Sequence, residues 1–299
     1  MPFLAYALVM VLVDPYNFFG LSNLVPRVAK QRTAEQYHPV LWKMIEFRRD
    51  PQANILLGDS RMNGINPEVI RKVSGARYYN FAFDACSLAE IVRTFWFADS
   101  LVKLQNVYIG LNFDMYNRYS ELDRTVDFHA MVGNPFRYFV DPTVFRGLRE
   151  SVMSAWTGKD PKSRWPKMSR EEFWRRQLAI VAAKNYKNFA HPDAFEKDLA
   201  RIAEHCRRKG IRLVFVSFPS HVDLQRRVGD FKLEGQRAAY LRELPTLAPV
   251  YDFDFPNVLS RDSTNYSDPY HFKPKAMEVL VGEVWGGRAP AYGKVLETR

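Results

Sequence analysis

The chain has 299 residues, of which 47% are hydrophobic, so it is long enough to bury a substantial core as one domain, with or without an insertion. We expect one domain. The 43 Lys and Arg residues against 33 Asp and Glu give a net charge of +10, which would suit a nucleic acid or an anionic surface. The basic residues are scattered in short groups, however, without the interleaved aromatics of a nucleic-acid module, so no nucleic-acid partner is predicted. Two cysteines are too few for a disulfide framework.

The N-terminal stretch "MPFLAYALVMVLV" is an uncharged apolar run that ends at Asp14-Pro15. It is shorter than the roughly 20 residues of a spanning helix, so a buried helix or a signal segment is the alternative reading. No small-residue cleavage site follows it, and we interpret residues 1–20 as a membrane anchor or signal-anchor ahead of a main domain at 21–299. Basic residues follow the run and none precedes it, which by the positive-inside rule alone would favour a cytoplasmic main domain.

Five apolar runs rich in β-branched or aromatic residues follow, each nearly continuous, as in strands that are buried on both faces. They lie at 54–58, 77–83, 106–112, 211–218 and 248–253. Helical patterns lie between most of them, at 34–49, 67–73, 87–104, 193–209 and 224–243. This alternation predicts an α/β fold, a three-layer α/β/α sandwich around a mainly parallel sheet of five strands.

About 95 residues separate the third and fourth strands, far more than a crossover needs, so we expect a helical insertion at about 115–190. Asp141-Pro142 predicts the start of one helix, and a capping box of Ser169 with Glu172 predicts the start of another.

The first strand ends abruptly in "LGDSR", which places Ser60 at the carboxyl end of a buried strand. A serine in this position can be a nucleophile if a histidine takes its proton and a carboxylate orients that histidine. Near the C-terminus, "NYSDPYHFKP" offers Asp268 and His271 three residues apart on one loop. Asp-Pro is also a common way to open a turn, so the pair alone is weak evidence.

Two further strand ends are expected at the same edge of the sheet. Asn112 follows the third strand in "IGLNFD", where its side-chain amide could donate to an oxyanion or could simply end the strand. The backbone amide near Ala85 and Cys86 follows the second strand and is another candidate donor, although no glycine is present to let the backbone approach closely. No His, Cys and Asp cluster has a recognised ligand spacing, so neither a metal nor a cofactor is predicted.

The motifs "GDSR", "GLN" and "DPYH", in this order over residues 54–275, resemble blocks I, III and V of the SGNH, or GDSL-type, hydrolase superfamily. The resemblance implies a flavodoxin-like fold with Ser60 as nucleophile, Asp268 and His271 completing a triad, and an oxyanion hole formed by Ser60, Asn112 and Cys86. The block II glycine has no counterpart, and Phe113 separates Asn112 from Asp114. Arg61 replaces the usual leucine, where it would hold an acidic partner or bind an anionic group of the substrate.

"DPYNFFG" and "GDSR…GINP" are similar to a bacterial branch of this superfamily that O-acetylates exopolysaccharides such as alginate. That resemblance implies a serine esterase or O-acyltransferase for an acyl-ester or cell-envelope glycan substrate, with a membrane-bound O-acyltransferase as partner. It also implies a single-pass protein of the bacterial inner membrane with a periplasmic catalytic domain. The alternative is a catalytically silent glycan-binding or assembly component that keeps the fold.

Overall fold

The protein is described here from a computed structural model that covers residues 2–21, 24–118, 123–159, 168–287 and 289–297. It divides into two compact units. The helical unit comprises Met1–Pro51 and Arg124–Lys167, and the sheet unit comprises Gln52–Asp123 and Met168–Arg299. Each is considered by itself.

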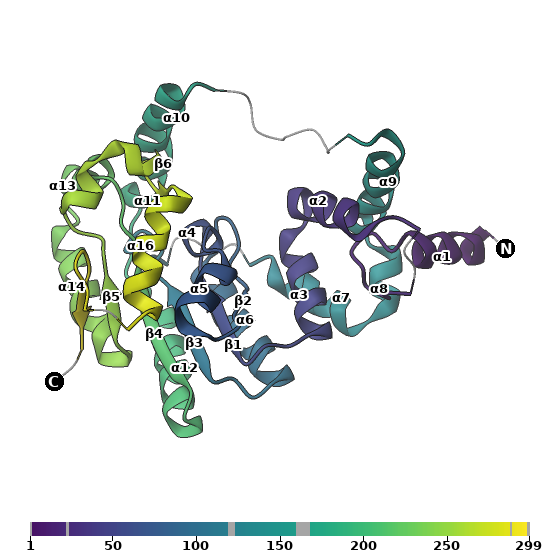
Figure 1. Cartoon of the computed structure of the whole chain (residues 1–299), viewed down its shortest axis with the longest axis horizontal. Helices are drawn as coiled ribbons and strands as arrows, with labels where there is room; N and C mark the ends of the chain where they lie inside the picture. The colour runs from purple at the N-terminus through teal and green to yellow at the C-terminus, as the bar shows by residue number, and fades with distance from the viewer. Residues whose placement is uncertain (1, 22–23, 119–122, 160–167, 288, 298–299) are drawn as a thin grey trace. The chain divides into compact units, whose positions relative to one another are not determined.

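The sheet unit is built around six strands in the order β2-β1-β3-β4-β5-β8 (Figure 1). The strands are β1 (Asn54–Leu57), β2 (Tyr79–Asn80), β3 (Asn106–Gly110), β4 (Arg212–Ser217), β5 (Val250–Asp252) and β8 (Lys294–Leu296). The first five are parallel, and β8 pairs antiparallel with β5. Because the five strands run in one direction, their carboxyl ends share one edge of the sheet.

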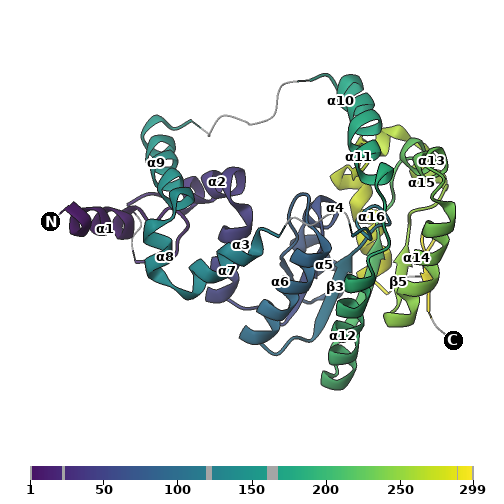
Figure 2. The ribbon, with the colours of Figure 1, turned by 180° about the vertical axis from the view of Figure 1, so that it is seen from behind.

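Helices cover both faces of this sheet. On one face, α5 (Pro67–Ser74) and α16 (Pro274–Trp285) bury side chains such as Ile70 and Leu280 against Leu56, Tyr108 and Val214 of the strands (Figure 1). On the other face lie α6 (Leu88–Leu101) and α12 (Asp193–Lys209), which pack against each other and on β1 and β4 respectively (Figure 2). The predicted α/β/α sandwich is therefore present.

The remaining helices of the sheet unit lie in its connections. They are α4 (Ser60–Asn63), α10 (Arg170–Arg176), a π-helical turn (Gln177–Val181), α11 (Ala182–Lys187), α13 (Val222–Asp230), α14 (Glu234–Leu247) and α15 (Val258–Arg261). A separate hairpin of β6 (Tyr266–Asp268) and β7 (His271–Phe272) precedes α16.

The helical unit consists of α1 (Pro2–Val13), α2 (Arg27–Tyr37), α3 (Pro39–Arg49), α7 (Thr125–Gly133), α8 (Pro135–Val140) and α9 (Pro142–Thr157). The helix α1 ends where Asp14 turns the chain: its buried carboxylate accepts hydrogen bonds from the backbone N–H groups of Phe18, Phe19 and Gly20. No helix within the described residues is long and apolar enough to cross a membrane.

Three details differ from the expectation. The sheet has six strands rather than five, because the short strand β8 adds to β5 after the last helix. The helix expected at 34–49 is two helices, since Pro39 cannot donate a backbone hydrogen bond and His38 adopts a non-helical conformation. The helix expected at 224–243 is likewise interrupted, near Lys232, whose φ is +57°.

The boundaries of the two units differ from the domain and insertion boundaries expected from the sequence. Residues 124–167 of the expected insertion group with residues 1–51, whereas 168–190 belong to the sheet unit. Residues 119–122 and 160–167 of that insertion lie outside the described residues.

Candidate active site

Ser60 lies at a sharp turn between a strand and a helix. The strand β1 ends at Leu57, Gly58 has a φ of +148°, and α4 begins at Ser60 with Asp59 as its cap. A Cβ atom on Gly58 would lie 2.9 Å from the carbonyl oxygen of Gly110, so only glycine lets β1 and β3 end this close together. The turn leaves Ser60 partly exposed at the carboxyl edge of the sheet.

The β6–β7 hairpin brings His271 to this serine. The Oγ of Ser60 lies 2.7 Å from Nε2 of His271, and Nδ1 of the same ring lies 2.7 Å from Oδ2 of Asp268. Asp268 is buried, and its other carboxylate oxygen accepts the backbone N–H of Tyr270 at 2.9 Å, which fixes the carboxylate in the turn. The structure thus brings together the three residues that the sequence nominated, although they are 211 positions apart at the widest.

The charge balance around His271 favours an imidazole that is readily protonated. Burial opposes the charged ring, but the hydrogen bond to Asp268 and its charge, with a contribution from Asp59, outweigh burial and raise the pKa of His271. The side chain remains 34% exposed, so a substrate can reach it. A neutral ring that donates Nδ1–H to Asp268 has Nε2 available as the acceptor for the serine proton.

Arg61 is buried beneath the serine. Its guanidinium donates to Asp59 at 2.6 Å and to Asp114 at 2.9 Å, and only 3% of its side chain is exposed. Of the two roles expected for Arg61, the structure shows the acidic partner, and substrate binding by Arg61 stays a prediction. Burial raises the pKa of Asp114, and the charge of Arg61 opposes that rise. Burial lowers the pKa of Arg61, but Asp114 and Asp59 outweigh burial and raise it, so the guanidinium stays charged.

Asn112 is buried at the end of β3 and bonded to the backbone of Phe218. Its Nδ2 donates to the carbonyl oxygen of Phe218 at 2.6 Å, and its Oδ1 accepts the N–H of the same residue at 3.0 Å. This pair ties the end of β3 to the end of β4, and Asn112 is only 1% exposed. The bond to Phe218 uses one of the two hydrogens on Nδ2, so the oxyanion role of Asn112 stays a prediction.

The loop after β2 runs alongside the serine turn. The N–H of Phe83 donates to the carbonyl oxygen of Gly58 at 3.1 Å, and Nδ2 of Asn63 donates to Asp84 at 3.1 Å. Ala85 adopts a φ of +51°, the left-handed conformation that glycine adopts without strain. Cys86 is buried in this loop, and an oxyanion contact from its backbone stays a prediction.

One cluster of possible metal ligands occurs within the described residues, formed by His191, Asp193 and Glu196. The ring of His191 is held between two carboxylates, with Nδ1 2.6 Å from Asp193 and Nε2 2.8 Å from Glu243. The hydrogen bond to Glu243 leads the contributions that raise the pKa of His191. Both ring nitrogens of His191 therefore already have carboxylate partners.

No protein-family model and no curated protein sequence matches the chain. Among solved structures, a protein of Desulfitobacterium hafniense assigned to the lipolytic G-D-S-L family is 12% identical and has a TM-score of 0.37 over 77% of this chain and 96% of its own. A protein of Bacteroides fragilis assigned as an acylhydrolase is 11% identical, with a TM-score of 0.39 over 76% of this chain and 82% of its own. The catalytic domain of a peptidoglycan O-acetyltransferase from Streptococcus pneumoniae is 13% identical, with a TM-score of 0.34 over 82% and 97%. We base the functional proposal on the geometry of the site rather than on these similarities.

Proposed function

We propose that this protein is a serine esterase or O-acyltransferase that forms an acyl-enzyme at Ser60. The observation that supports this most strongly is the continuous hydrogen-bonded series of Ser60, His271 and Asp268, at 2.7 Å for each link. A nucleophile, a base and a carboxylate that orients the base are the set that acyl transfer requires.

In this mechanism the Oγ of Ser60 attacks the ester carbonyl while its proton passes to Nε2 of His271. Asp268 stabilises the imidazolium, and the backbone N–H of Ser60, the second Nδ2 hydrogen of Asn112 and the loop at Cys86 donate to the oxyanion. The tetrahedral intermediate then expels the alcohol, which takes the proton from His271. Water or a sugar hydroxyl, deprotonated by the same ring, attacks the acyl-serine and regenerates the enzyme.

The proposed acyl group is acetyl or another short acyl group, and the proposed substrate is a cell-envelope or exopolysaccharide glycan. This finer assignment rests on the motif resemblance, as do the proposed membrane-bound O-acyltransferase partner and the periplasmic location. It is tested by supplying an activated acetyl ester with and without oligosaccharides: a transferase forms acetylated sugar, whereas an esterase releases only acetate.

The competing function is a catalytically silent glycan-binding component, which the missing block II glycine and the Phe113 between Asn112 and Asp114 favour. Turnover of p-nitrophenyl acetate separates the two. The proposal expects wild-type turnover that is abolished by Ser60→Ala and unchanged by Ser74→Ala, a serine whose hydroxyl bonds only to the nearby backbone of Ile70 and Ala76. Folded wild-type protein without turnover would favour the silent component.

A further inference from the structure

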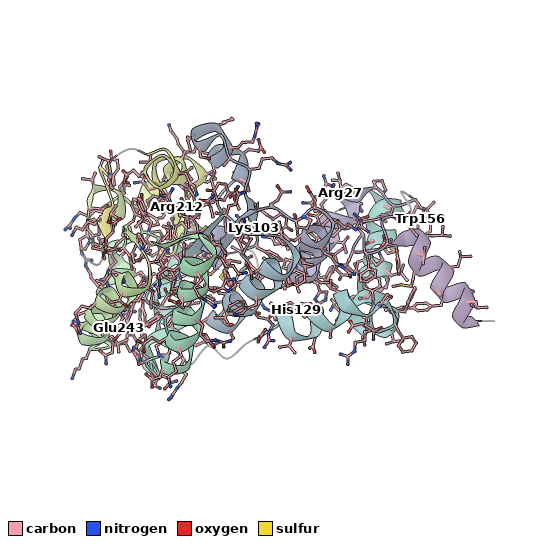
Figure 3. All side chains as sticks on the ribbon, turned by 90° about the horizontal axis from the view of Figure 1, so that it is seen from below. Arg27, Lys103, His129, Trp156, Arg212 and Glu243 are labelled. Carbon is pink, nitrogen blue, oxygen red and sulfur yellow. The ribbon has the colours of Figure 1, made fainter. Side chains whose placement is uncertain are left out.

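The helix α9 presents an apolar row to solvent where a surface helix normally presents polar side chains. Phe145, Val152 and Trp156 recur at helical spacing and are 54%, 39% and 84% exposed, and Met153 beside them is 44% exposed. Figure 3 labels Trp156 on this helix. Val144 and Leu148 on the adjoining side of α9 are buried in the helical unit, so the exposed row extends the apolar side of the helix into solvent.

Neighbouring helices of the same unit extend this surface. On α8, Phe136 and Val140 are four residues apart and 63% and 55% exposed. The helix α1 packs on α9, where the ring of Tyr6 lies 6.4 Å from that of Phe145. The exposed side chains of α1 are all apolar, namely Leu4, Ala5, Leu8, Val9 and Leu12. Exposed apolar side chains on three adjoining helices indicate an interaction surface rather than isolated surface residues.

The charges around these side chains are mainly positive. Arg137, Arg146 and Arg149 are exposed on α8 and α9, whereas the acidic residues there, Glu150 and the cap Asp141, are both partly buried. The helical unit has 14 Lys and Arg against 8 Asp and Glu, a net charge of +6, while the sheet unit, with 29 against 25, has +4. A second copy of this unit would bring like charges together, but an anionic lipid surface complements them.

We propose that the exposed face of α8 and α9, defined by Phe136, Val140, Phe145, Val152 and Trp156, binds an anionic lipid bilayer in the plane of its interface. Phe and Trp side chains enter the boundary between headgroups and acyl chains, and the arginines beside them extend to the phosphates. The proposed acyl-transfer chemistry is not required for this binding.

The test is flotation of the full chain with vesicles of phosphatidylglycerol and phosphatidylethanolamine, compared with phosphatidylcholine alone. Wild-type protein binds the anionic vesicles more tightly, and the preference falls as salt is added. Because burying one large apolar side chain corresponds to roughly tenfold in affinity, Phe136→Ser and Trp156→Ser should each weaken binding about tenfold. Arg137→Gln with Arg149→Gln should reduce the preference for anionic vesicles and leave binding to phosphatidylcholine unchanged.

Val258→Ser is the matched control, because Val258 is 76% exposed but belongs to the sheet unit. It should bind as the wild type does. Circular dichroism verifies that each variant is folded. The proposal is overturned if Phe136→Ser and Trp156→Ser bind vesicles as tightly as the wild type. It is equally overturned if light scattering shows that these substitutions convert a dimer to a monomer while vesicle binding stays the same, since the face would then bind a second copy.

Discussion

Replacing Arg61 with methionine should destabilise the sheet unit by about 3–5 kcal/mol at neutral pH, the usual cost of removing one partner from a buried ion pair. The guanidinium lies between Asp59 and Asp114, whose side chains are 12% and 9% exposed, so two nearly buried carboxylates would lose their counter-charge together. Methionine fills a similar volume, and the loss is therefore mainly electrostatic.

The effect should depend on pH with a definite sign. Burial already raises the pKa of Asp114, and without Arg61 that folded-state pKa rises further above its unfolded value. A carboxyl group with a raised folded pKa binds more protons when folded, so the variant loses stability as the pH rises from about 4 through that pKa. The penalty should therefore be smaller at pH 5 than at pH 8.

Urea unfolding followed by circular dichroism at both pH values measures this penalty. Arg71→Met is the control, because the pair of Arg71 and Glu68 is 52% and 62% exposed and should contribute less than about 1 kcal/mol. Adding Asp114→Asn to Arg61→Met should recover part of the loss. A penalty for Arg61→Met as small as that of Arg71→Met, or one that does not change with pH, would refute the reasoning.

Three further outcomes are expected from the site. The value of kcat/KM should fall as the pH drops through the pKa of His271, with a midpoint above the usual value of about 6.5, and a midpoint below 6 would contradict the contribution of Asp268. Asn112→Ala should lower stability by about 1–3 kcal/mol through the unpaired backbone of Phe218 and lower kcat/KM by about 10²–10³ through the lost oxyanion donor, while a loss of less than tenfold would remove Asn112 from the oxyanion hole. Ala85→Gly should raise the free energy of unfolding by about 0.5–1 kcal/mol, because relief of the left-handed conformation exceeds the added entropy of the unfolded chain, and a melting temperature below that of the wild type would contradict this.

The parts of the fold that the sequence predicted are those whose signal is local. The five parallel strands are near-continuous apolar runs, and the caps of Asp141 and Ser169 form the hydrogen bonds expected of them. The strand β8 could not be predicted in this way, because three residues with mainly exposed side chains carry no apolar run and pair only once β5 is in place.

As with the fold, the parts of the site that the sequence predicted are those with a local signal. Ser60 and the Asp268–His271 loop are separate local motifs, and a parallel sheet brings strand ends to one edge. The functions of Asn112 and Arg61 depend instead on side-chain partners that are distant in sequence. Phe218 is 106 residues from Asn112, and Asp114 is 53 residues from Arg61, so motif position alone could not show that both side chains are already bonded.

The formation of an acyl-serine at Ser60 tests the central claim most directly. Wild-type protein is mixed with p-nitrophenyl acetate, quenched in acid within the first turnover, and digested for mass spectrometry. The account predicts one added acetyl group on the peptide that contains Ser60, absent from Ser60→Ala and strongly reduced in His271→Ala. Acetylation at a different residue, or turnover that persists in Ser60→Ala, would contradict it.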